Sequence, residues 1–216
     1  MQKIKVGVLG SGDVGKVLAG GFLGLGHAVK IGSRDPGKLR EWAASAGDSA
    51  STGTFEDAAK FGDILVLATL GTGTLSAIEL AGTDNFANKV VIDATNPLEF
   101  STGSPKLSVG WNDSLGEQVQ RAIPAAKVVK AFNTVGNALM INPQLPGGPP
   151  TMFLCGNDDD AKKIVSQICD HFGWEVSDLG GIESSRYLEP LCMVWVLHGF
   201  RTGSWTHAFK IVKKAG

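Results

Sequence analysis

The sequence is short of cysteine, of long hydrophobic runs and of net charge, and each shortage excludes a class of protein. Its three cysteines, Cys155, Cys169 and Cys192, form no pair at metal-ligand spacing, so we expect reduced, buried thiols and neither disulfides nor a metal site. The most apolar stretches, 64–70 and 191–197, are far too short to cross a bilayer. Twenty Lys and Arg against twenty-one Asp and Glu leave a net charge of −1, which argues against a nucleic-acid binder.

From the N-terminal residues we expect no export signal. Residues 1–8 lead straight into a strand-like pattern, without a basic region, an apolar stretch and a cleavage site. Together with the reduced cysteines, this favours a cytoplasmic protein that binds neither membrane nor nucleic acid.

Glycine is the residue in excess. The chain has 29 glycines among 216 residues, about twice the usual share, and they follow no collagen-like period. Apolar residues make up 43% and charged residues 19%, which is typical of one globular domain or of one large domain with an appendage. So much glycine indicates tight turns and places where the backbone approaches a ligand closely.

Short apolar runs alternate with longer amphipathic segments along most of the chain. This pattern predicts strands at 3–9, 28–31, 63–68, 89–94, 127–132, 151–155 and 174–177, and helices at 13–25, 36–46, 74–81, 113–122 and 158–172. The acidic run 158–160 is interpreted as the cap of its helix rather than as a metal site. From 182 to 212 we expect two or three helices, interrupted at Pro190, Gly199 and Gly203.

A glycine-rich turn follows the first predicted strand and opens the first predicted helix. It reads Gly10-Ser11-Gly12-Asp13-Val14-Gly15, which is the G-x-G-x-x-G spacing of dinucleotide-binding βαβ units. Gly10 permits the tight turn, Gly12 lets the backbone approach a pyrophosphate, and Gly15 lets the helix pack against the strand. The sequence therefore predicts an α/β protein with a Rossmann-type, doubly wound, mostly parallel sheet and a small α-rich C-terminal part.

The end of the second predicted strand indicates which dinucleotide is bound. NAD-selective sites place an Asp or Glu there, whereas this chain has Ser33 and Arg34, with Lys38 one helical turn further on. A hydroxyl, a guanidinium and an ammonium group suit a 2′-phosphate, so we expect NADP(H). A solvated basic turn is the alternative interpretation.

Three more loops follow predicted strands, at the sheet edge where open α/β proteins bind ligands. They contain Thr69 and Leu70, Asn96 and Pro97, and Asn133, which we expect to line the ribose and nicotinamide half of the dinucleotide.

None of these loops offers a Lys–His or Tyr–Lys pair of the kind that reduces a carbonyl group. We therefore expect no catalytic side chain and a hydride acceptor that needs no positioned acid, such as a flavin-like ring. The histidines fit this expectation, because His27 and His171 fall at helix ends and His198 and His207 fall in the predicted C-terminal helices.

The order of motifs along about 200 residues of this chain resembles that of a family of NADP-dependent oxidoreductases. The family is typified by coenzyme F-420:NADP oxidoreductase and by the cytosolic domain of the six-transmembrane ferric reductases. The resemblance lies in 10–15, 32–34 with Lys38, 46–48 leading to Gly53 and 56–59, 63–69, 128–134, 155–159, 178–181 and 184–186. It implies a Rossmann domain, NADP(H), a small α-rich C-terminal part and frequent dimers. In that family the Ser, Arg and Lys that match Ser33, Arg34 and Lys38 hold the 2′-phosphate.

On the acceptor side, the sequence resembles one branch of this family and differs from the other. The F-420 enzymes carry a His where this chain has Asn133, and the segment 130–134 resembles the ferric-reductase branch instead. We expect residues 1–150 to form the NADP-binding domain, and residues 151–216 to pack on it as part of the acceptor cleft and of a homodimer contact.

The leading hypothesis is an enzyme that transfers a hydride between NADPH and a small-molecule acceptor, a flavin or an F-420-like deazaflavin. One alternative is a non-catalytic NADP(H) sensor. Another is an imine- or hydroxyacid-type dehydrogenase, which needs a Lys or an acid in the cleft, whereas Lys130 is predicted inside a strand.

Overall fold

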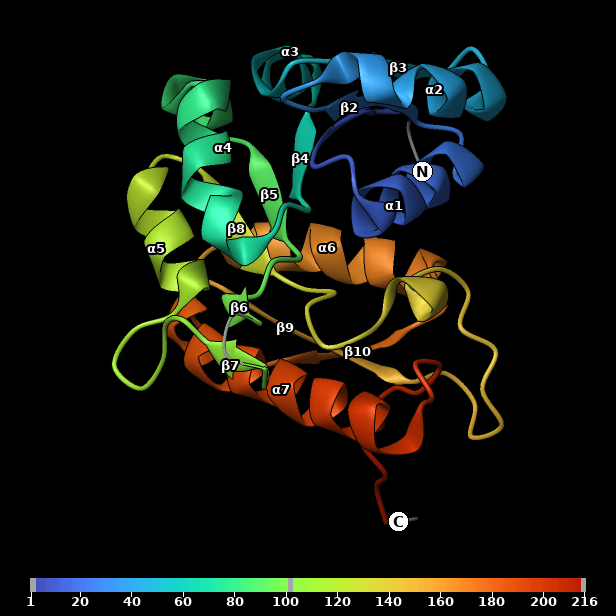
Figure 1. The fold of residues 1–216 in the computed structure, drawn as a ribbon, viewed down its shortest axis with the longest axis vertical. Helices are drawn as coiled ribbons and strands as arrows, with labels where there is room; N and C mark the ends of the chain where they lie inside the picture. The colour runs from blue at the N-terminus through green and yellow to red at the C-terminus, as the bar shows by residue number, and fades with distance from the viewer. Residues whose placement is uncertain (1–2, 101–102, 215–216) are drawn as a thin grey trace.

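Residues 3–100 and 103–214, which the computed structural model describes, form one eight-stranded sheet with helices packed against it (Figure 1). The strands of this sheet are β1 (Lys5–Leu9), β2 (Ala28–Gly32), β3 (Ala50–Gly53), β4 (Ile64–Leu67), β5 (Val90–Asp93), β8 (Lys127–Lys130), β9 (Thr151–Gly156) and β10 (Glu175–Asp178). A hairpin of β6 (Leu98–Glu99) and β7 (Lys106–Leu107) forms a separate small sheet. The α-helices are α1 (Asp13–Gly24), α2 (Arg40–Ala46), α3 (Phe55–Phe61), α4 (Thr74–Ala81), α5 (Leu115–Ala122), α6 (Asp159–His171) and α7 (Ser185–Thr202).

The strand order is β10-β9-β8-β5-β4-β1-β2-β3. The strands β2 and β3 therefore lie on one side of β1, and β4 and the strands that follow it lie on the other side. Within the described residues, β8 and β9 are antiparallel, and the other neighbouring strands of this sheet are parallel. This arrangement confirms the predicted doubly wound, mostly parallel sheet. It also puts the carboxyl ends of β1, β2, β4, β5 and β8 at one edge, where such folds bind ligands.

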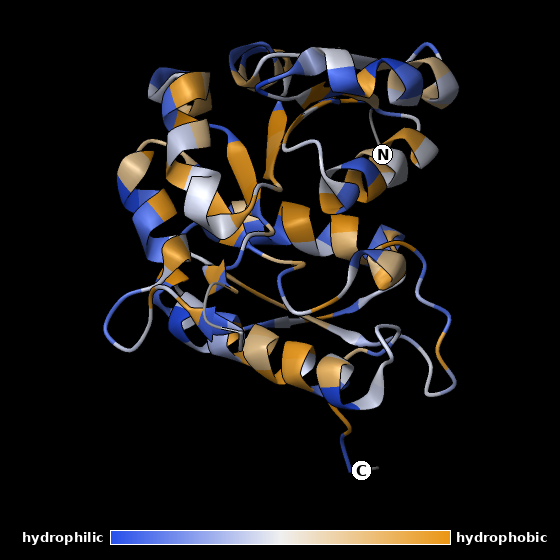
Figure 2. Cartoon of the chain, viewed as in Figure 1, coloured by the Kyte–Doolittle hydropathy of each residue, from blue (hydrophilic) through white to orange (hydrophobic). Residues whose placement is uncertain are grey.

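The sheet separates two hydrophobic cores. Successive side chains of a strand point to opposite faces, so in β4 Ile64 and Val66 belong to the core under α1 and α6. Leu65 and Leu67 belong to the core under α3, α4 and α5. Being buried on both sides, β4 and β5 are hydrophobic along nearly their whole length, as Figure 2 shows. The continuous apolar runs seen in the sequence have this cause.

The prediction does not include the strands β3, β6 and β7 or the helix α3. β3 is a half-buried edge strand of small residues, and its sequence has none of the apolar run that marks a central strand. α3 was recognisable, because Thr54 and Asp57 form a capping box in which each side chain accepts a hydrogen bond from the other residue's backbone N–H. The predicted helix 36–46 divides into a 3-10 turn, Pro36–Leu39, followed by α2.

The expectation of two or three C-terminal helices is wrong, because α7 is continuous through Pro190 and Gly199. A Cβ atom at Gly199 would collide with the ring of Trp205, so this glycine allows close packing and does not end the helix. The helix ends at Gly203, which adopts the left-handed conformation with φ +70°. His207 therefore lies beyond the helix. Among the described residues, no helix combines the length and the hydropathy needed to cross a bilayer.

Candidate functional site

The glycine-rich turn lies between β1 and α1, as predicted, and two of its glycines are required by the protein's own packing. Gly10 has φ +135°, and a Cβ atom there would collide with the carbonyl group of Ala68. A Cβ atom at Gly15 would collide with the carbonyl oxygen of Gly10. Both glycines bring neighbouring backbone segments together, so any residue larger than glycine would force the turn open.

Gly12 is different, because its Cβ position meets no described atom within 4 Å. The residue is extended, with φ −76° and ψ −177°, a conformation that any amino acid adopts. It is the N-cap of α1, and no side chain of the described residues caps that helix end. The turn thus leaves open space in front of N–H groups that α1 itself cannot satisfy, which fits a pyrophosphate. Ser11, Asp13 and Val14 complete the turn and are half-buried or exposed.

The end of β2 lies directly beside this turn. The hydroxyl of Ser33 donates to the hydroxyl of Ser11 at 3.3 Å and accepts from the backbone N–H of Asp35 at 3.1 Å. Arg34 and Lys38 are exposed, and the Nζ of Lys38 is 3.9 Å from a carboxylate oxygen of Asp35. Because Asp35 also accepts the N–H of Gly37, its carboxylate is held in the turn. The structure therefore places Ser33 next to the glycine turn, and Arg34 and Lys38 are exposed on the segment that follows it.

The loop after β4 joins the glycine turn to the loop after β5. Thr69 and Thr74 share a hydrogen bond of 2.9 Å between their hydroxyls, which fixes the loop to the start of α4. Leu70 is 84% exposed, so its side chain is available to a ligand. A Cβ atom at Gly71 would collide with the carbonyl oxygen of Asn96, so these two loops are in van der Waals contact.

Asn96 and Asn133 form a reciprocal amide pair at the ends of β5 and β8. The side-chain NH₂ of Asn96 donates to the backbone carbonyl of Asn133 at 2.7 Å, and that of Asn133 donates to Oδ1 of Asn96 at 3.0 Å. Pro97 follows, buried. The Oδ1 of Asn133 is buried and has no hydrogen-bond partner among the described residues. An unpaired buried acceptor costs free energy, which makes this atom a candidate acceptor for a ligand N–H group, such as that of a nicotinamide carboxamide. Because the atom is closed to solvent, a ligand reaches it only when the neighbouring side chains move.

Phe132 directs the backbone toward this pair. It has φ +63°, an uncommon conformation for a bulky residue, while its ring is buried against Phe172 at 6.0 Å between centroids. Such backbone strain persists only where the surrounding packing holds it, and it occurs often at ligand sites.

The prediction missed a buried ionic cluster directly behind the amide pair. Lys130 is the last residue of β8 and not an interior one, and it is fully buried. Its Nζ is 2.9 Å from Asp93 and 3.1 Å from Glu189, and it donates to the carbonyl oxygen of Thr95 at 2.8 Å. A charged residue ending each of two buried strands, 90–93 and 127–130, with opposite signs was the signal that could have revealed this cluster.

The charges of this cluster are mutually dependent. Burial acts to lower the pKa of Lys130, but the carboxylates of Asp93 and Glu189 outweigh it and raise that pKa above its ordinary value. Burial raises the pKa of Glu189, and the neighbouring ammonium group opposes the shift. Lys130 is thus an ammonium group at neutral pH, paired inside the protein and closed to solvent.

The cysteines are free and buried, as the sequence indicates. Burial raises the pKa of Cys155 to about 11 and that of Cys192 to about 12, and it also raises the pKa of Cys169. All three are therefore protonated thiols at neutral pH.

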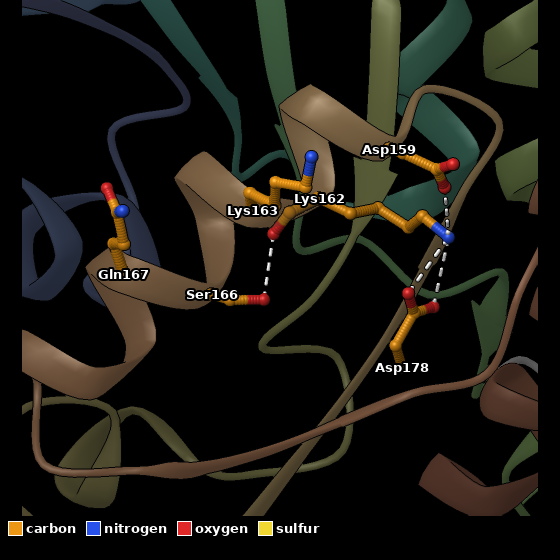
Figure 3. A pocket seen from close by; sticks show the side chains of 6 residues that line it. All are labelled: Asp159, Lys162, Lys163, Ser166, Gln167 and Asp178. Atoms are coloured by element: carbon orange, nitrogen blue, oxygen red, sulfur yellow. Dashed lines mark hydrogen bonds and ion pairs between the residues drawn. The ribbon is translucent and has the colours of Figure 1, made fainter.

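A separate hollow is lined by charged and polar groups. It lies on α6 and β10, and its lining residues are Asp159, Lys162, Lys163, Ser166, Gln167 and Asp178 (Figure 3). Lys162 pairs with Asp159 at 3.1 Å and with Asp178 at 2.9 Å. Lys163 pairs with Asp160 at 3.0 Å, so both lysines of the hollow are neutralised by neighbouring carboxylates.

Comparisons with known proteins indicate the family of this chain. A family model described as "NADP oxidoreductase coenzyme F420-dependent" matches residues 5–97. The F420-dependent NADP reductase of Methanocaldococcus jannaschii is 31% identical over 201 residues, which cover 87% of this chain and 89% of that protein. Metalloreductase STEAP3 of Rattus norvegicus is 32% identical over 189 residues, but this chain spans only 36% of its length.

Solved structures show the same relationship. A crystal structure from Arthrobacter sp. FB24, whose name proposes F420-dependent NADP reductase activity, is 39% identical and covers 97% of this chain and all of its own, with a TM-score of 0.93. A reductive aminase from Aspergillus terreus bound to NADPH has a TM-score of 0.68 at 16% identity, and so shares the fold alone. The chain therefore belongs to the family of coenzyme F420-dependent NADP oxidoreductases, and it is an NADP-dependent oxidoreductase.

Proposed function

We propose that this protein transfers a hydride between NADPH and a flavin or deazaflavin acceptor. The observation that carries the proposal is the continuous line of contacts along the carboxyl edge of the sheet. It runs from Ser33 through Ser11 and the glycine turn to the loop after β4, and from there to Asn96 and Asn133. A line of this kind suits an extended dinucleotide, with its 2′-phosphate at one end, its pyrophosphate at the glycine turn and its nicotinamide at the other end.

The residues of each loop have distinct tasks in this proposal. Ser33, Arg34 and Lys38 hold the 2′-phosphate with charge-assisted hydrogen bonds. The turn 10–15 presents the N–H groups of α1 to the pyrophosphate. The loops that contain Thr69 with Leu70 and Asn96 with Pro97 line the ribose and nicotinamide.

Asn133 supplies its unpaired Oδ1 to orient the carboxamide. Bound NADPH supplies the hydride.

The same edge favours a ring-shaped acceptor over a carbonyl compound. The ionisable groups behind the amide pair, Asp93, Lys130 and Glu189, are at most 1% exposed and paired with one another, so they cannot exchange a proton with a substrate. The chain then contributes orientation and exclusion of water, which suffice for hydride transfer between two rings. The relatives named for F420-dependent NADP reduction support a deazaflavin in particular.

Anaerobic oxidation of NADPH, followed at the nicotinamide absorbance, tests this function. The acceptors to compare are F420, FMN, FAD and a ferric chelate. Turnover on F420 or on a flavin supports the proposal. Binding of NADPH without turnover on any acceptor would overturn the proposal in favour of a redox sensor. Turnover on the ferric chelate alone would overturn it by showing that the acceptor is a ferric ion.

We further propose that residues 1–150 form the NADP-binding domain and that residues 151–216 contribute to the acceptor cleft and to a homodimer contact. Tyr187, Val194 and Leu197 lie on one face of α7 and are 74%, 54% and 50% exposed. Light scattering after size exclusion tests the contact: Val194→Glu should convert a dimer into a monomer. A wild-type protein with the mass of one chain would contradict it.

A further inference from the structure

The buried cluster of Asp93, Lys130 and Glu189 connects three parts of the fold at one point. Asp93 ends β5, Lys130 ends β8 and Glu189 comes from α7, nearly a hundred positions beyond Asp93 in the chain. All three side chains are at most 1% exposed. Removing charges from water is costly, and a buried ion pair usually stabilises a fold no more than apolar residues of the same size do. Stability alone therefore gives little reason for the cluster.

Each carboxylate in the cluster is held by further hydrogen bonds. Glu189 accepts the backbone N–H groups of Leu115 and Gly116 at 3.0 and 2.9 Å, at the N-terminus of α5. Asp93 accepts the backbone N–H and the hydroxyl of Thr95, at 3.0 and 2.6 Å. Because both carboxylates are fixed, the ammonium group between them has a single favourable position.

From that position Lys130 fixes the backbone that carries the amide pair. Its Nζ donates to the carbonyl oxygen of Thr95, and Asn96 follows immediately. Three residues after Lys130 comes Asn133, whose amide is bonded to Asn96 and to the carbonyl oxygen of Leu188 in α7. The cluster and the amide pair thus share the same three elements: the ends of β5 and β8, and α7.

We infer that Lys130 is a positioning residue for the nicotinamide end of the cofactor, because it holds Thr95 and thereby sets the Asn96–Asn133 amide pair. Asp93 and Glu189 hold Lys130 in place. The inference rests on the proposed function, since it deepens the role of the same edge. It concerns orientation only, because Lys130 itself is closed to solvent and cannot touch a ligand.

A pair of ligands separates this role from a merely structural one. NADP⁺ contacts the whole edge, whereas 2′,5′-ADP contains the 2′-phosphate and adenosine but no nicotinamide. Lys130→Met should raise the Kd of NADP⁺ about tenfold, because hydrogen bonds at the nicotinamide end are lost. The Kd of 2′,5′-ADP should stay within about twofold of the wild-type value. Isothermal titration calorimetry measures both. Glu189→Gln is the milder second variant, because glutamine keeps the length of the side chain and one acceptor oxygen.

Arg186→Met is the matched control. It breaks another ion pair between α5 and α7, in which the guanidinium of Arg186 donates to both carboxylate oxygens of Glu117, without touching Thr95. This control should leave the ratio of the two Kd values at the wild-type level. The inference is overturned if Arg186→Met changes the ratio as much as Lys130→Met does, or if folded Lys130→Met and Glu189→Gln both keep the wild-type ratio.

Stereochemistry gives a second readout. With NADPH deuterated at one or the other C4 position, the wild type should transfer one hydrogen only, and Lys130→Met should transfer both, because the carboxamide is no longer held. Retained stereospecificity in Lys130→Met would overturn the inference. The proposed function fails separately, when the wild type shows no turnover in the acceptor panel, and the ratio of Kd values still tests Lys130 in that case.

Discussion

The hydroxyl groups of Ser11 and Ser33 lie 3.3 Å apart, joined by a hydrogen bond across 22 positions of the chain. Ser11 belongs to the glycine turn after β1, and Ser33 follows β2. This contact places the proposed 2′-phosphate site and the proposed pyrophosphate site side by side. The adjoining Arg34 is the residue that we propose to distinguish NADPH from NADH.

Arg34→Ala should weaken the binding of NADPH and leave that of NADH nearly unchanged. Losing one charge-assisted hydrogen bond typically costs about 1.5–3 kcal/mol, or roughly ten- to a hundredfold in Kd. NADH lacks the 2′-phosphate, so its Kd should stay nearly unchanged. Fluorescence titration of both nucleotides measures the effect, and Arg40→Ala, an exposed arginine of α2, is the control. Equal losses for the two nucleotides would refute the assignment of the phosphate site.

Gly12→Val should abolish dinucleotide binding while the fold survives. The conformation of Gly12 is open to valine, and its Cβ position points into free space within the described structure, so the protein itself gains no clash. The new methyl groups would occupy the space proposed for the pyrophosphate. Gly20→Val is a matched control, since no described atom lies within 4 Å of its Cβ position either. Circular dichroism checks the fold, and tight NADPH binding by folded Gly12→Val would contradict the prediction.

Buried His27 should make the protein less stable in mild acid. Its Nδ1 accepts the backbone N–H of Ile4, and burial lowers the pKa of this side chain below 6.5. Below pH 6.5 the unfolded chain binds a proton that the folded chain refuses, so the free energy of unfolding falls with decreasing pH. The slope is at most about 1.4 kcal/mol per pH unit, and above pH 6.5 this contribution is fully present.

Urea unfolding between pH 5 and pH 8 measures that slope. His27→Asn, which keeps an acceptor near Ile4, should reduce it, whereas His198→Asn at an exposed position should not. The same slope in wild type and His27→Asn would assign the acid sensitivity to other groups.

The three cysteines should resist thiol reagents in the folded protein. A pKa of about 11, as for Cys155, leaves roughly one molecule in a thousand as thiolate at pH 8, and burial blocks access as well. Ellman's reagent should therefore label native protein slowly, but all three thiols at once in urea. One rapidly labelled thiol in native protein would show a cysteine site that opens.

The features that the sequence predicted are those encoded within a few neighbouring residues. The strand, turn and helix around 10–15 follow from local periodicity and from the conformational freedom of Gly10. The cap of α6 by Asp158 is local in the same way. The capping box at Thr54 was equally local, and α3 could have been predicted from it.

What failed in the prediction depends on packing. Pro190 and Gly199 are helix breakers in isolation, yet α7 is continuous because its buried side, with Leu188, Cys192 and Trp195, packs on the rest of the protein. Tertiary contacts of this kind outweigh the propensity of one residue.

The sequence by itself determined the fold class, the glycine turn and the chemistry available at the end of β2. Only the tertiary structure decided that Asn96 pairs with Asn133 and that Lys130 lies between Asp93 and Glu189. These partners are 37 to 96 positions apart, counted from Asn96 to Asn133 and from Asp93 to Glu189. These contacts form because β5 and β8 are neighbours in the sheet and because α7 packs against their ends. Neither arrangement is determined by the residues of one segment.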